Sequence, residues 1–417
     1  MPKPYDAVIV GTRVAGAATA MLLARRGLRV LAVDRARFPS DTLSTHQIQL
    51  PGVACLRRWG LLDEVVAAGT PATRRLRFDA GDVVLNGRYP VYEDVDALYS
   101  PRRTILDQIL VEAARAAGAE IRESFIVDEL CWADGRVTGI RGFERGRPPV
   151  TEPARLVIGA DGKHSFVARA VGARRYRGHD PRTVACYTYW SGLSGEAGEI
   201  YRRAGRAAAV FPTNDDLTMI YASMPVADFA KARGDLAGHY LKILDGCGDL
   251  GDRCRDAARV ERLRTTPDLP NALRTPYGPG WALVGDAGQV LDPITAYGIT
   301  NAFRDAERLA DAVTRDGPRS AALARYHRDR DAAGTAMYDF TIDLAALARP
   351  GAAERQLYAA LADRPAEISR FFGVLTGAIP IIGYFTARNM IRLLGPRRLA
   401  RLARLGLAGA RPQCARV

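Results

Sequence analysis

The chain contains little cysteine and no long apolar run. Six cysteines are spread over 417 residues without a C-x-x-C pair, which excludes a disulfide scaffold and a thiolate zinc site and is typical of a reducing compartment. The longest apolar stretch, Phe371 to Phe385, covers 15 residues and is broken by glycine and proline, whereas a membrane-spanning helix needs roughly 20. The first residues, MPKPYDAVIVG, lack the basic segment and cleavage site of a secretion signal. We therefore expect a soluble, cytoplasmic protein.

Lysine is also rare, since only four of the 59 basic residues are lysine and the net charge is +13. An excess of arginine of this kind is typical of a GC-rich genome. The sequence contains no aromatic-interleaved basic stretch and no zinc-finger or helix-turn-helix spacing, so we expect no nucleic-acid partner. The five histidines show no metal-ligand spacing, and we expect no metal site. Hydrophobic residues at 48% and charged residues at 25% indicate an ordinary globular chain.

The N-terminal segment predicts a βαβ unit. Residues 7–10 (AVIV) form a short apolar strand, a glycine turn follows, residues 15–26 favour a helix, and residues 28–33 form a second strand. Such a crossover requires parallel pairing. Because neither strand alternates in polarity, we expect helices on both faces of the sheet. Residues 156–160 (LVIGA) and 281–284 (WALV) have the same parallel-sheet character.

The middle of the chain has a different pattern. Around residues 74–89 and 182–224, short strands alternate in polarity and are joined by turn residues, with one hairpin turning at residues 213–216. These segments indicate an antiparallel sheet inserted into an α/β domain. From Thr300 onward the sequence is rich in Ala, Arg and Leu and predicts helices. The result is two interleaved domains with a helical C-terminus.

The first glycine turn, Gly11 to Gly16, reads G-x-x-x-x-G, with Arg13 at the second glycine position of a dinucleotide-binding turn. In such a turn the glycines allow a sharp bend and close helix–strand packing, and the helix N-terminus binds the pyrophosphate. Arg13 could add charge toward the phosphates, or the turn could be a broken motif that binds nothing. Asp34 follows 18 residues after Gly16, where a carboxylate contacts the ribose.

Two later motifs strengthen this interpretation. The first, GADGKHS, follows a buried strand and contains Asp161 and Gly162. The second, VGDAGQVLDPITAYGI, presents Asp286 after a strand, bends at Pro293 and leads into a helix that begins near Gly298. The amides of that helix would point back toward the bend. A carboxylate for a polyol chain and amide donors for an electron-rich ring would suit a flavin.

Taken in this order, the motifs resemble those of the FAD-dependent monooxygenase superfamily of the para-hydroxybenzoate hydroxylase type, which also includes flavin-dependent halogenases and geranylgeranyl reductases. The resemblance covers residues 5 to about 338. It implies a discontinuous Rossmann-like FAD-binding domain (1–73, 101–180 and 276–340), an interleaved antiparallel-sheet substrate domain (74–100 and 181–275) and a C-terminal helical region (341–417). The cofactor-binding residues that it implies are Gly11, Arg13, Val14, Ala15, Gly16, Asp34, Arg35, Thr45, Arg103, Val127, Asp161, Gly162, Gly285, Asp286, Pro293, Gly298 and Ile299.

The same resemblance implies an FAD-dependent oxidoreductase. The leading interpretation is a monooxygenase that hydroxylates or epoxidises an apolar or aromatic natural-product-like molecule through a C4a-hydroperoxyflavin. Electrons would come from NADH, NADPH or a separate reductase, and O2 would be the co-substrate. The flavin carries the chemistry, so no catalytic triad is required. His46, in the stretch DTLSTH, and Tyr297 are the candidates for a catalytic side chain.

We expect the substrate cavity between the flavin and the antiparallel sheet. Its candidate lining residues are aromatic, as is usual in pockets for organic molecules: Tyr187, Tyr189, Phe211, Tyr221 and Tyr297. Tyr297 stands where similar sequences often have glutamine, and a phenol there would narrow the cavity beside the ring.

Three alternatives remain open. A double-bond reductase of the geranylgeranyl reductase type shares the FAD motifs and could use the basic, apolar C-terminus (GPRRLARLARLGL) for weak contact with an anionic membrane surface. A halogenase is disfavoured because the chain has no W-x-W-x-I-P motif, and Lys163, in the second motif, is not an evident catalytic lysine. A non-catalytic flavin-binding accessory protein would hold FAD without turnover. The sequence does not indicate an oligomeric state.

Overall fold

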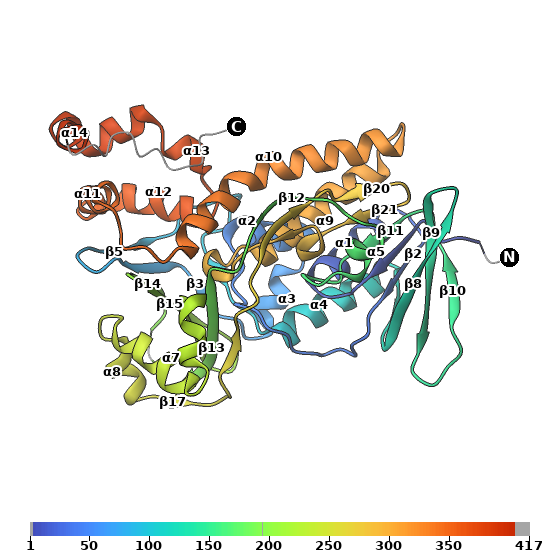
Figure 1. Cartoon of the computed structure of the whole chain (residues 1–417), viewed down its shortest axis with the longest axis horizontal. Helices are drawn as coiled ribbons and strands as arrows, with labels where there is room; N and C mark the ends of the chain where they lie inside the picture. Colours follow the sequence, from blue (N-terminus) through green and yellow to red (C-terminus); the bar gives the residue numbers. More distant parts are fainter. Residues whose placement is uncertain (1–2, 194, 405–417) are drawn as a thin grey trace.

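The computed structural model describes residues 3–193 and 195–404, apart from the side chains of residues 397–404. Its first sheet is six-stranded and supplies the framework of the N-terminal motifs (Figure 1). In spatial order its strands are β20 (Tyr277–Gly278), β21 (Trp281–Leu283), β11 (Val157–Gly159), β1 (Ala7–Val10), β2 (Val30–Val33) and β7 (Glu120–Arg122). All neighbours from β21 to β7 pair in parallel, and β20 is an antiparallel edge strand. The four parallel strands predicted from the sequence are therefore confirmed.

The two faces of this sheet are covered by different layers. Ala7 and Ile9 pack in one apolar cluster with helices α1 (Val14–Ala24), α4 (Arg103–Ala116) and α9 (Gly298–Thr314). Val8 and Val10 point to the other face, which is covered by the strands β8 (Phe125–Ala133), β9 (Arg136–Glu144) and β10 (Val150–Pro153) and the short helix α5 (Phe166–Ala170). The expectation of helices on both faces is confirmed for the first face, whereas on the second face only the short helix α5 joins a cover made mainly of antiparallel strands. Unbroken apolar strands require a cover, and an antiparallel sheet provides it as well as helices do.

The second large sheet is mainly antiparallel and has eight strands. They are β17 (Ala258–Arg259), β13 (Thr183–Ser191), β16 (Thr218–Pro225), β15 (Arg206–Pro212), β14 (Gly198–Arg203), β4 (Arg75–Asp79) and β5 (Val84–Arg88) in spatial order, with β18 (Arg264–Thr266) paired to β13. The predicted hairpin at residues 213–216 is confirmed, because β15 and β16 pair with Pro212 opposite Thr218. The outer face of the eight-stranded sheet packs on η1 (Val226–Asp228), α6 (Phe229–Ala232), α7 (Leu236–Asp245) and α8 (Leu250–Arg255).

The inner face of this sheet is turned toward the parallel-sheet half of the molecule. Because side chains alternate along a strand, Tyr187 and Tyr189 on β13 share this face with Met219 and Tyr221 on β16. Smaller strand pairs complete the sheets: β3 (Ala72–Thr73) with β6 (Leu98–Tyr99), and β12 (Arg175–His179) with β19 (Asn271–Arg274) and β22 (Gln289–Val290). The chain enters the parallel sheet several times, which confirms the interleaved α/β fold. The domain limits remain predictions.

Helices follow the last strand, as predicted, and α9 begins at Gly298. The further helices are α10 (Arg319–Ala345), α11 (Ala352–Leu361), α12 (Pro365–Leu375), α13 (Ile381–Tyr384) and α14 (Ala387–Arg404). In Figure 1, α11 to α14 lie at the far end from β8–β10, beside β5. No helix within the described ranges combines the length and the apolar character that crossing a bilayer requires. The predicted membrane contact concerns side chains from Arg397 onward, which lie outside the described residues.

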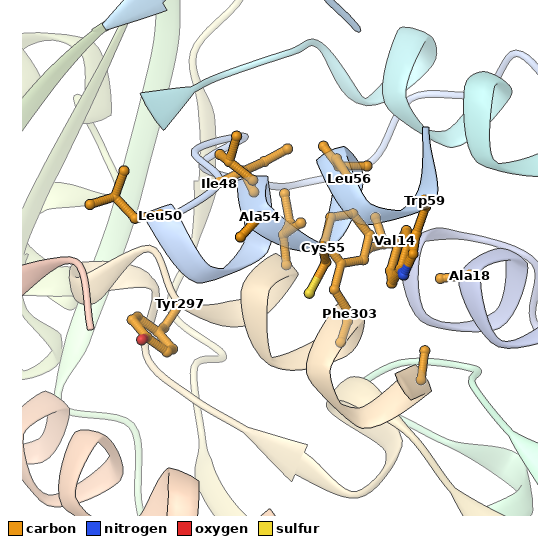
Figure 2. Close-up of a cluster of buried hydrophobic side chains, with 14 of the residues drawn as sticks. Val14, Ala18, Ile48, Leu50, Ala54, Cys55, Leu56, Trp59, Tyr297 and Phe303 are labelled. Atoms are coloured by element: carbon orange, nitrogen blue, oxygen red, sulfur yellow. The ribbon is translucent and has the colours of Figure 1, made fainter. Parts of the chain in front are cut away.

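Helix α2 (Leu50–Trp59) packs in the hydrophobic core and so positions residues 41–49, which directly precede it. Figure 2 shows Cys55 and Trp59 of α2 beside Val14 of α1 and Phe303 of α9. The Trp59 and Phe303 rings meet edge to face with their centroids 5.0 Å apart, an arrangement that contributes about 1 kcal/mol beyond the area it buries. Gly52 allows the close approach of α2 to α9, because a Cβ there would lie 2.6 Å from the Thr300 hydroxyl oxygen. The segment of residues 41–49, which directly precedes α2, is thereby held against the start of α9. The next helix, α3 (Leu62–Ala67), contributes Val65 to the same buried cluster.

Candidate active site

The predicted motifs lie together at one edge of the parallel sheet. Gly11, Asp34, Asp161 and Gly285 each follow a parallel strand within one or two residues, and those strands are neighbours in the order β21, β11, β1, β2. The carboxyl ends of such strands form the binding crevice in α/β proteins. The structure also brings two motifs into direct contact, because a Cβ on Gly285 would lie 2.8 Å from that of Ala15.

The glycine turn is built for close backbone packing. Gly11 has φ +96°, and a Cβ there would lie 2.5 Å from the carbonyl oxygen of Ala160. A Cβ on Gly16 would lie 1.7 Å from the carbonyl oxygen of Gly11. Helix α1 starts at Val14, and no side chain within the described ranges caps its first turn. The amides of residues 14–16 therefore face the crevice as hydrogen-bond donors for a phosphate.

Asp34 is fixed at the next strand end. Its carboxylate accepts hydrogen bonds from the Thr12 amide at 2.7 Å and the Ala36 amide at 2.8 Å, and the side chain is buried. These bonds use part of the acceptor capacity of the two oxygens, so that a ribose hydroxyl could still donate to them. The neighbouring Arg35 is exposed. Val127 lies on β8, two residues after Phe125, whose amide donates to the Asp34 carbonyl oxygen at 2.8 Å. The strand that contains the predicted cofactor-binding residue Val127 thus begins beside Asp34.

Arg13 and Arg103 share one buried carboxylate that the sequence analysis missed. Arg103 binds Asp107 through two nitrogens, with Nη2 to Oδ1 at 2.9 Å, and the Asp107 side chain is fully buried. Arg13 reaches the same carboxylate at 3.2 Å and also donates to the Ser40 hydroxyl at 2.8 Å. Burial raises the pKa of Asp107, and the two guanidinium groups lower it. The Arg103–Asp107 spacing of four residues on a helix was the signal that could have revealed this pair.

We expect Arg13→Ala to weaken FAD binding about tenfold at low ionic strength, and less at high salt, because charge-assisted contacts to phosphate are screened. The side chain is 28% exposed, so it can turn toward a bound phosphate. The measurement is FAD affinity by fluorescence quenching at two salt concentrations. Arg26→Ala is the matched control, since Arg26 follows the same helix and pairs at the surface with Asp311. An unchanged affinity at low salt would show that Arg13 only holds the Ser40 segment.

The second motif caps a helix. The Asp161 carboxylate accepts from the Ser165 hydroxyl at 2.5 Å and from the Phe166 amide at 2.6 Å, and thereby fixes the start of α5. Gly162 has φ +79° with open space around it. Lys163 pairs with Asp268 at 3.1 Å. The predicted support of the pyrophosphate region by Asp161 and Gly162 would therefore act through the backbone of this loop.

The third motif presents a carboxylate to the same crevice. The Gly285 amide donates to the buried Asp305 carboxylate at 3.1 Å, which fixes the turn η2 (Gly285–Ala287). Asp286 is exposed to solvent. Desolvation by the surrounding protein raises the pKa of its carboxyl, and the nearby cations of Arg103 and Lys163 lower it. Asp286 and Arg103 thus lie within electrostatic range of each other, as the FAD interpretation requires.

The bend after this motif leads into α9. The turn η3 (Pro293–Thr295) is followed by Ala296 at φ +51°, and α9 starts at Gly298 without a side-chain cap. Ile299 is buried beside it. Gln49, from the segment of residues 41–49, donates to the Thr295 carbonyl oxygen at 3.0 Å. Of the predicted cofactor residues, Thr45 and Pro293 line one cavity together with Gln49, which was not predicted.

His46 is buried next to this bend. It adopts φ +60°, its Nε2 forms a hydrogen bond with the Tyr189 hydroxyl, and its ring stacks on Tyr189 and meets Tyr187 edge-on. Burial, reinforced by the cations of Arg103 and Arg102, lowers the pKa of His46 well below its ordinary value. The imidazole is therefore neutral near pH 7. Its catalytic role remains a prediction.

A partly enclosed cavity of about 130 Å³ lies between the inner face of the large antiparallel sheet, the bend and the C-terminal helices. A single water needs only about 10–15 Å³ on this measure, so the space suits a small organic molecule. The lining is mainly apolar and aromatic: Leu76, Phe78, Tyr89, Leu98, Ile200, Ala207, Ala208, Ala209, Phe211, Tyr221, Ile294, Phe340, Leu344, Leu347, Leu357, Tyr358, Phe371, Leu375 and Phe385. Helices α10 to α12 form one wall, which the sequence analysis did not predict.

Two of the five predicted substrate residues line the cavity, and the other three are packed against other side chains. Phe211 and Tyr221 line the cavity. Tyr187 and Tyr189 lie on the same sheet face, where they pack around His46. Tyr297 is buried behind the wall and donates to the Thr376 carbonyl oxygen at 3.4 Å; Figure 2 shows it near Leu50. Direct contact of the last three with substrate would require a rearrangement of these packed side chains.

Asp292 is a fully buried carboxylate that the sequence analysis quoted without assigning a role. It accepts hydrogen bonds from the Thr183 hydroxyl at 2.5 Å and the Ile294 amide at 3.0 Å. Burial raises the pKa of Asp292 from 3.8 to about 6. The folded state therefore binds more protons than the unfolded chain between these values, and the wild type loses stability as the pH rises through this range.

We expect Asp292→Asn to flatten this pH dependence. At about 1.4 kcal/mol for each pKa unit, the wild-type free energy of unfolding should fall by about 2.4 kcal/mol more than that of the variant between roughly pH 4 and pH 7. An amide oxygen can still accept from Thr183 or Ile294. The measurement is urea unfolding of both proteins at both pH values. Parallel pH profiles would contradict the raised pKa.

Glycine-rich bends at the ends of parallel strands, with an acidic residue after the second strand, define the class as a dinucleotide-binding α/β protein. The family model described as "FAD binding domain" matches residues 4–226, more than half of the chain. The chain belongs to this family and to the FAD-dependent monooxygenase superfamily, and it is an FAD-dependent oxidoreductase.

Three comparisons illustrate the range of its relatives. A 1H-pyrrole-2-carbonyl-[peptidyl-carrier protein] brominase from Pseudoalteromonas luteoviolacea is 23% identical over 330 residues, 75% of this chain and 77% of that protein. A digeranylgeranylglycerophospholipid reductase from Methanocella arvoryzae is 27% identical over 349 residues, 81% and 86% of the two chains. The structure of PqsL, a probable FAD-dependent monooxygenase from Pseudomonas aeruginosa, has a TM-score of 0.68 at 22% identity and covers 89% of this chain and 99% of its own.

Proposed function

We propose that this protein is an FAD-dependent monooxygenase that hydroxylates or epoxidises an apolar or aromatic small molecule. The observation that carries the proposal is the apolar cavity, since its wall includes the Pro293 bend that we expect beside the flavin. Pockets for organic molecules are apolar, with few polar groups. An apolar lining also suits oxygen transfer, because water competes with the substrate for reactive intermediates.

The residues present fit FAD. The glycine turn leaves a space at the N-terminus of α1 that a Cβ on Gly11 or Gly16 would fill, so the backbone can approach a pyrophosphate. The amides of residues 14–16, Arg103 and Asp286 would hold the phosphates and ribityl chain, and Asp34 the adenosine ribose. Thr45, Pro293, Gly298 and Ile299 would lie against the ring. When bound, FAD would supply the activation of O2 after reduction by a donor.

The chain itself would position the substrate and exclude water. Phe211 and Tyr221 on the sheet, together with Phe371 and Leu375 on α12, would hold an apolar ring in the cavity. The Arg202 guanidinium lines the cavity, pairs with Glu354 and also donates a hydrogen bond to the Tyr358 hydroxyl at 3.0 Å. Arg202 and Glu354 thereby join the sheet to α11 over the cavity.

The test of the monooxygenase is oxygen incorporation. With FAD, NADH or NADPH and candidate aromatic compounds under ¹⁸O2, we expect substrate-dependent consumption of the nicotinamide and one labelled oxygen in the product. Anaerobic reduction by each nicotinamide separately, or only by an added reductase, would identify the donor. Unlabelled product, or turnover that needs no O2, would contradict the proposal. A cytoplasmic location belongs to the same proposal.

A double-bond reductase is the second candidate, because a relative is a digeranylgeranylglycerophospholipid reductase and the cavity has an apolar lining. It would saturate an isoprenoid anaerobically, and its activity would depend on detergent. Halogenation is disfavoured by the missing W-x-W-x-I-P motif and by the absence of lysine from the cavity lining within residues 3–193 and 195–404, although one relative is a brominase. Bromide- or chloride-dependent product formation would support it. A non-catalytic accessory protein would bind FAD without turnover.

A further inference from the structure

The cavity is elongated along strand β15. Side chains two residues apart on a strand share one face, and Ala207, Ala209 and Phe211 all line the cavity from β15. At about 3.3 Å per residue, the steps from Ala207 to Phe211 cover about 13 Å. The space therefore runs lengthwise over this strand, with Ala207 at one end and Phe211 at the other.

Helix α10 forms the opposite wall and runs along the same direction. Its lining residues extend from Phe340 to Leu347, which corresponds to about 10 Å of helix. The Leu347 carbonyl oxygen accepts a hydrogen bond at 2.8 Å from the amide of Gly205, in the turn before β15. The hydroxyl of Thr341, next to Phe340, lies 2.9 Å from that of Thr295 in the bend. One end of the cavity thus lies at the start of β15, and the other lies at the bend.

The end at the start of β15 reaches solvent. Arg202 on β14 is paired opposite Ala207, and it forms an ion pair with Glu354 of α11. Both charged residues line the cavity, and the Glu354 side chain is 42% exposed. We call this end, at Arg202 and Glu354, the mouth. It lies away from the bend that we expect beside the flavin.

The middle of the cavity is apolar and has room. Ala209 is paired opposite Ile200 on β14, and Ile200 is in turn opposite Phe78 on β4. All three line the cavity. Ala209 is only half-buried although it lies on the inner face of the sheet, because the cavity lies over it. No charged side chain within the described ranges lines the cavity between the mouth and the bend.

We propose that the cavity binds an extended apolar molecule lengthwise, with its reacting end at the Pro293 bend and its polar head at the mouth. The apolar part gains by leaving water, and the polar head keeps its hydration at the open end. An extended alkyl chain advances roughly 1.3 Å per carbon, so a length of about 13 Å accommodates about ten carbons. This inference rests on the proposed substrate cavity and names the substrate class. It holds for oxygenation and for reduction.

The test measures how binding depends on chain length. Isothermal titration calorimetry compares 1-hexanol, 1-octanol, 1-decanol and 1-dodecanol on the oxidised, FAD-loaded full chain without reductant. Each added methylene should tighten binding about fourfold up to 1-decanol. 1-Dodecanol should bind no more tightly than 1-decanol, because its two further carbons would remain outside the mouth. A gain that continues through 1-dodecanol, or affinities that do not change with length, would overturn the proposal.

Ala209→Leu fills the middle of the cavity, and Leu344→Phe narrows it at the same level from α10. Either variant should bind 1-decanol at least about tenfold more weakly than the wild type, while 1-hexanol changes little. Ala204→Leu is the control, since Ala204 is exposed in the turn before β15, and it should keep the wild-type length profile. Ala209→Leu should melt no lower than the wild type, because its side chain enters empty space. A lower melting temperature, or an unchanged length profile in both cavity variants, would contradict a lengthwise cavity.

The position of the polar head is tested with decanoate. A carboxylate at the solvent-reaching mouth keeps its hydration, so decanoate and 1-decanol should bind within about threefold of each other. A charged head buried at the bend would be desolvated, and decanoate binding more than about tenfold weaker would overturn the assignment of the head to the mouth. These titrations involve no turnover. A failed ¹⁸O2 experiment would therefore leave the length profile standing, and a failed length profile would leave oxygenation standing.

Discussion

Gly16→Ala should abolish FAD retention and destabilise the fold. The new Cβ would lie 1.7 Å from the carbonyl oxygen of Gly11 and 3.2 Å from the Cβ of Ala160, so α1 would have to move away from β1 and β11. Overpacking of this kind costs about 3 kcal/mol or more when the clash is with backbone. The displaced helix would also withdraw its first amides from the phosphate position. We expect FAD affinity to fall at least about a hundredfold, a loss of roughly 2.7 kcal/mol.

The matched control is Gly234→Ala. Gly234 is exposed, and a Cβ there would meet no atom within 4 Å. This variant should keep both its FAD affinity and its melting temperature. Urea unfolding and a flavin titration measure the two effects separately. If Gly16→Ala bound FAD like the wild type, the glycine turn would not be part of the cofactor site.

Asp286→Ala should weaken FAD binding by about 10- to 100-fold and leave the fold intact. A hydrogen bond to a charged group contributes about 1.5–3 kcal/mol, which corresponds to that range. The side chain is exposed, so its removal leaves no buried partner unsatisfied. Flavin occupancy after purification and the dissociation constant of added FAD are the measurements.

Asp311→Ala serves as the comparison for this prediction. Asp311 is another exposed aspartate, on the same helix that the third motif leads into, and it pairs with Arg26 at the surface. It should retain wild-type affinity. Equal occupancy in Asp286→Ala and the wild type would contradict the assignment of this carboxylate to the flavin.

The sequence predicts that the glycine turn and the three acidic motifs lie close together, because the carboxyl ends of parallel strands meet at the same edge of a sheet. Once Ala7–Val10 and Val30–Val33 are read as parallel neighbours, the residues after them must lie close together. The cover of the sheet was not predictable in the same way. Val8 and Val10 reveal that a face is buried, but not whether a helix or the β8–β10 sheet covers it. Apolar periodicity describes the buried side chain and leaves its partner open.

In the candidate site, the sequence predicts which side chains share a face of the sheet, but not which of them border the cavity. Alternation along the strands predicts that Tyr187, Tyr189 and Tyr221 share one face. Which of them borders the cavity depends on the segment of residues 41–49 and on the C-terminal helices. His46 occupies the space beside the first two, and only Tyr221 of the three remains open to the cavity. The local sequence around β13 and β16 contains no information about these distant segments.

Asp107 and Asp292 are both buried carboxylates, but only the partner of Asp107 could be predicted from the sequence. Asp107 lies four residues after Arg103, and this helical spacing alone favours the observed pair. Asp292 is adjacent to Pro293 in the sequence, but its partner Thr183 lies on β13, 109 residues away. A buried carboxylate whose partner is that distant cannot be distinguished from a turn residue by sequence pattern.

The measurement that tests this account most directly is the stoichiometry of FAD binding to the purified chain. The account predicts a yellow protein, or an apoprotein that takes up one FAD per chain with quenching of the flavin fluorescence, and loss of that binding in Gly16→Ala and Asp286→Ala. A colourless protein that melts cooperatively and takes up no added FAD would contradict it.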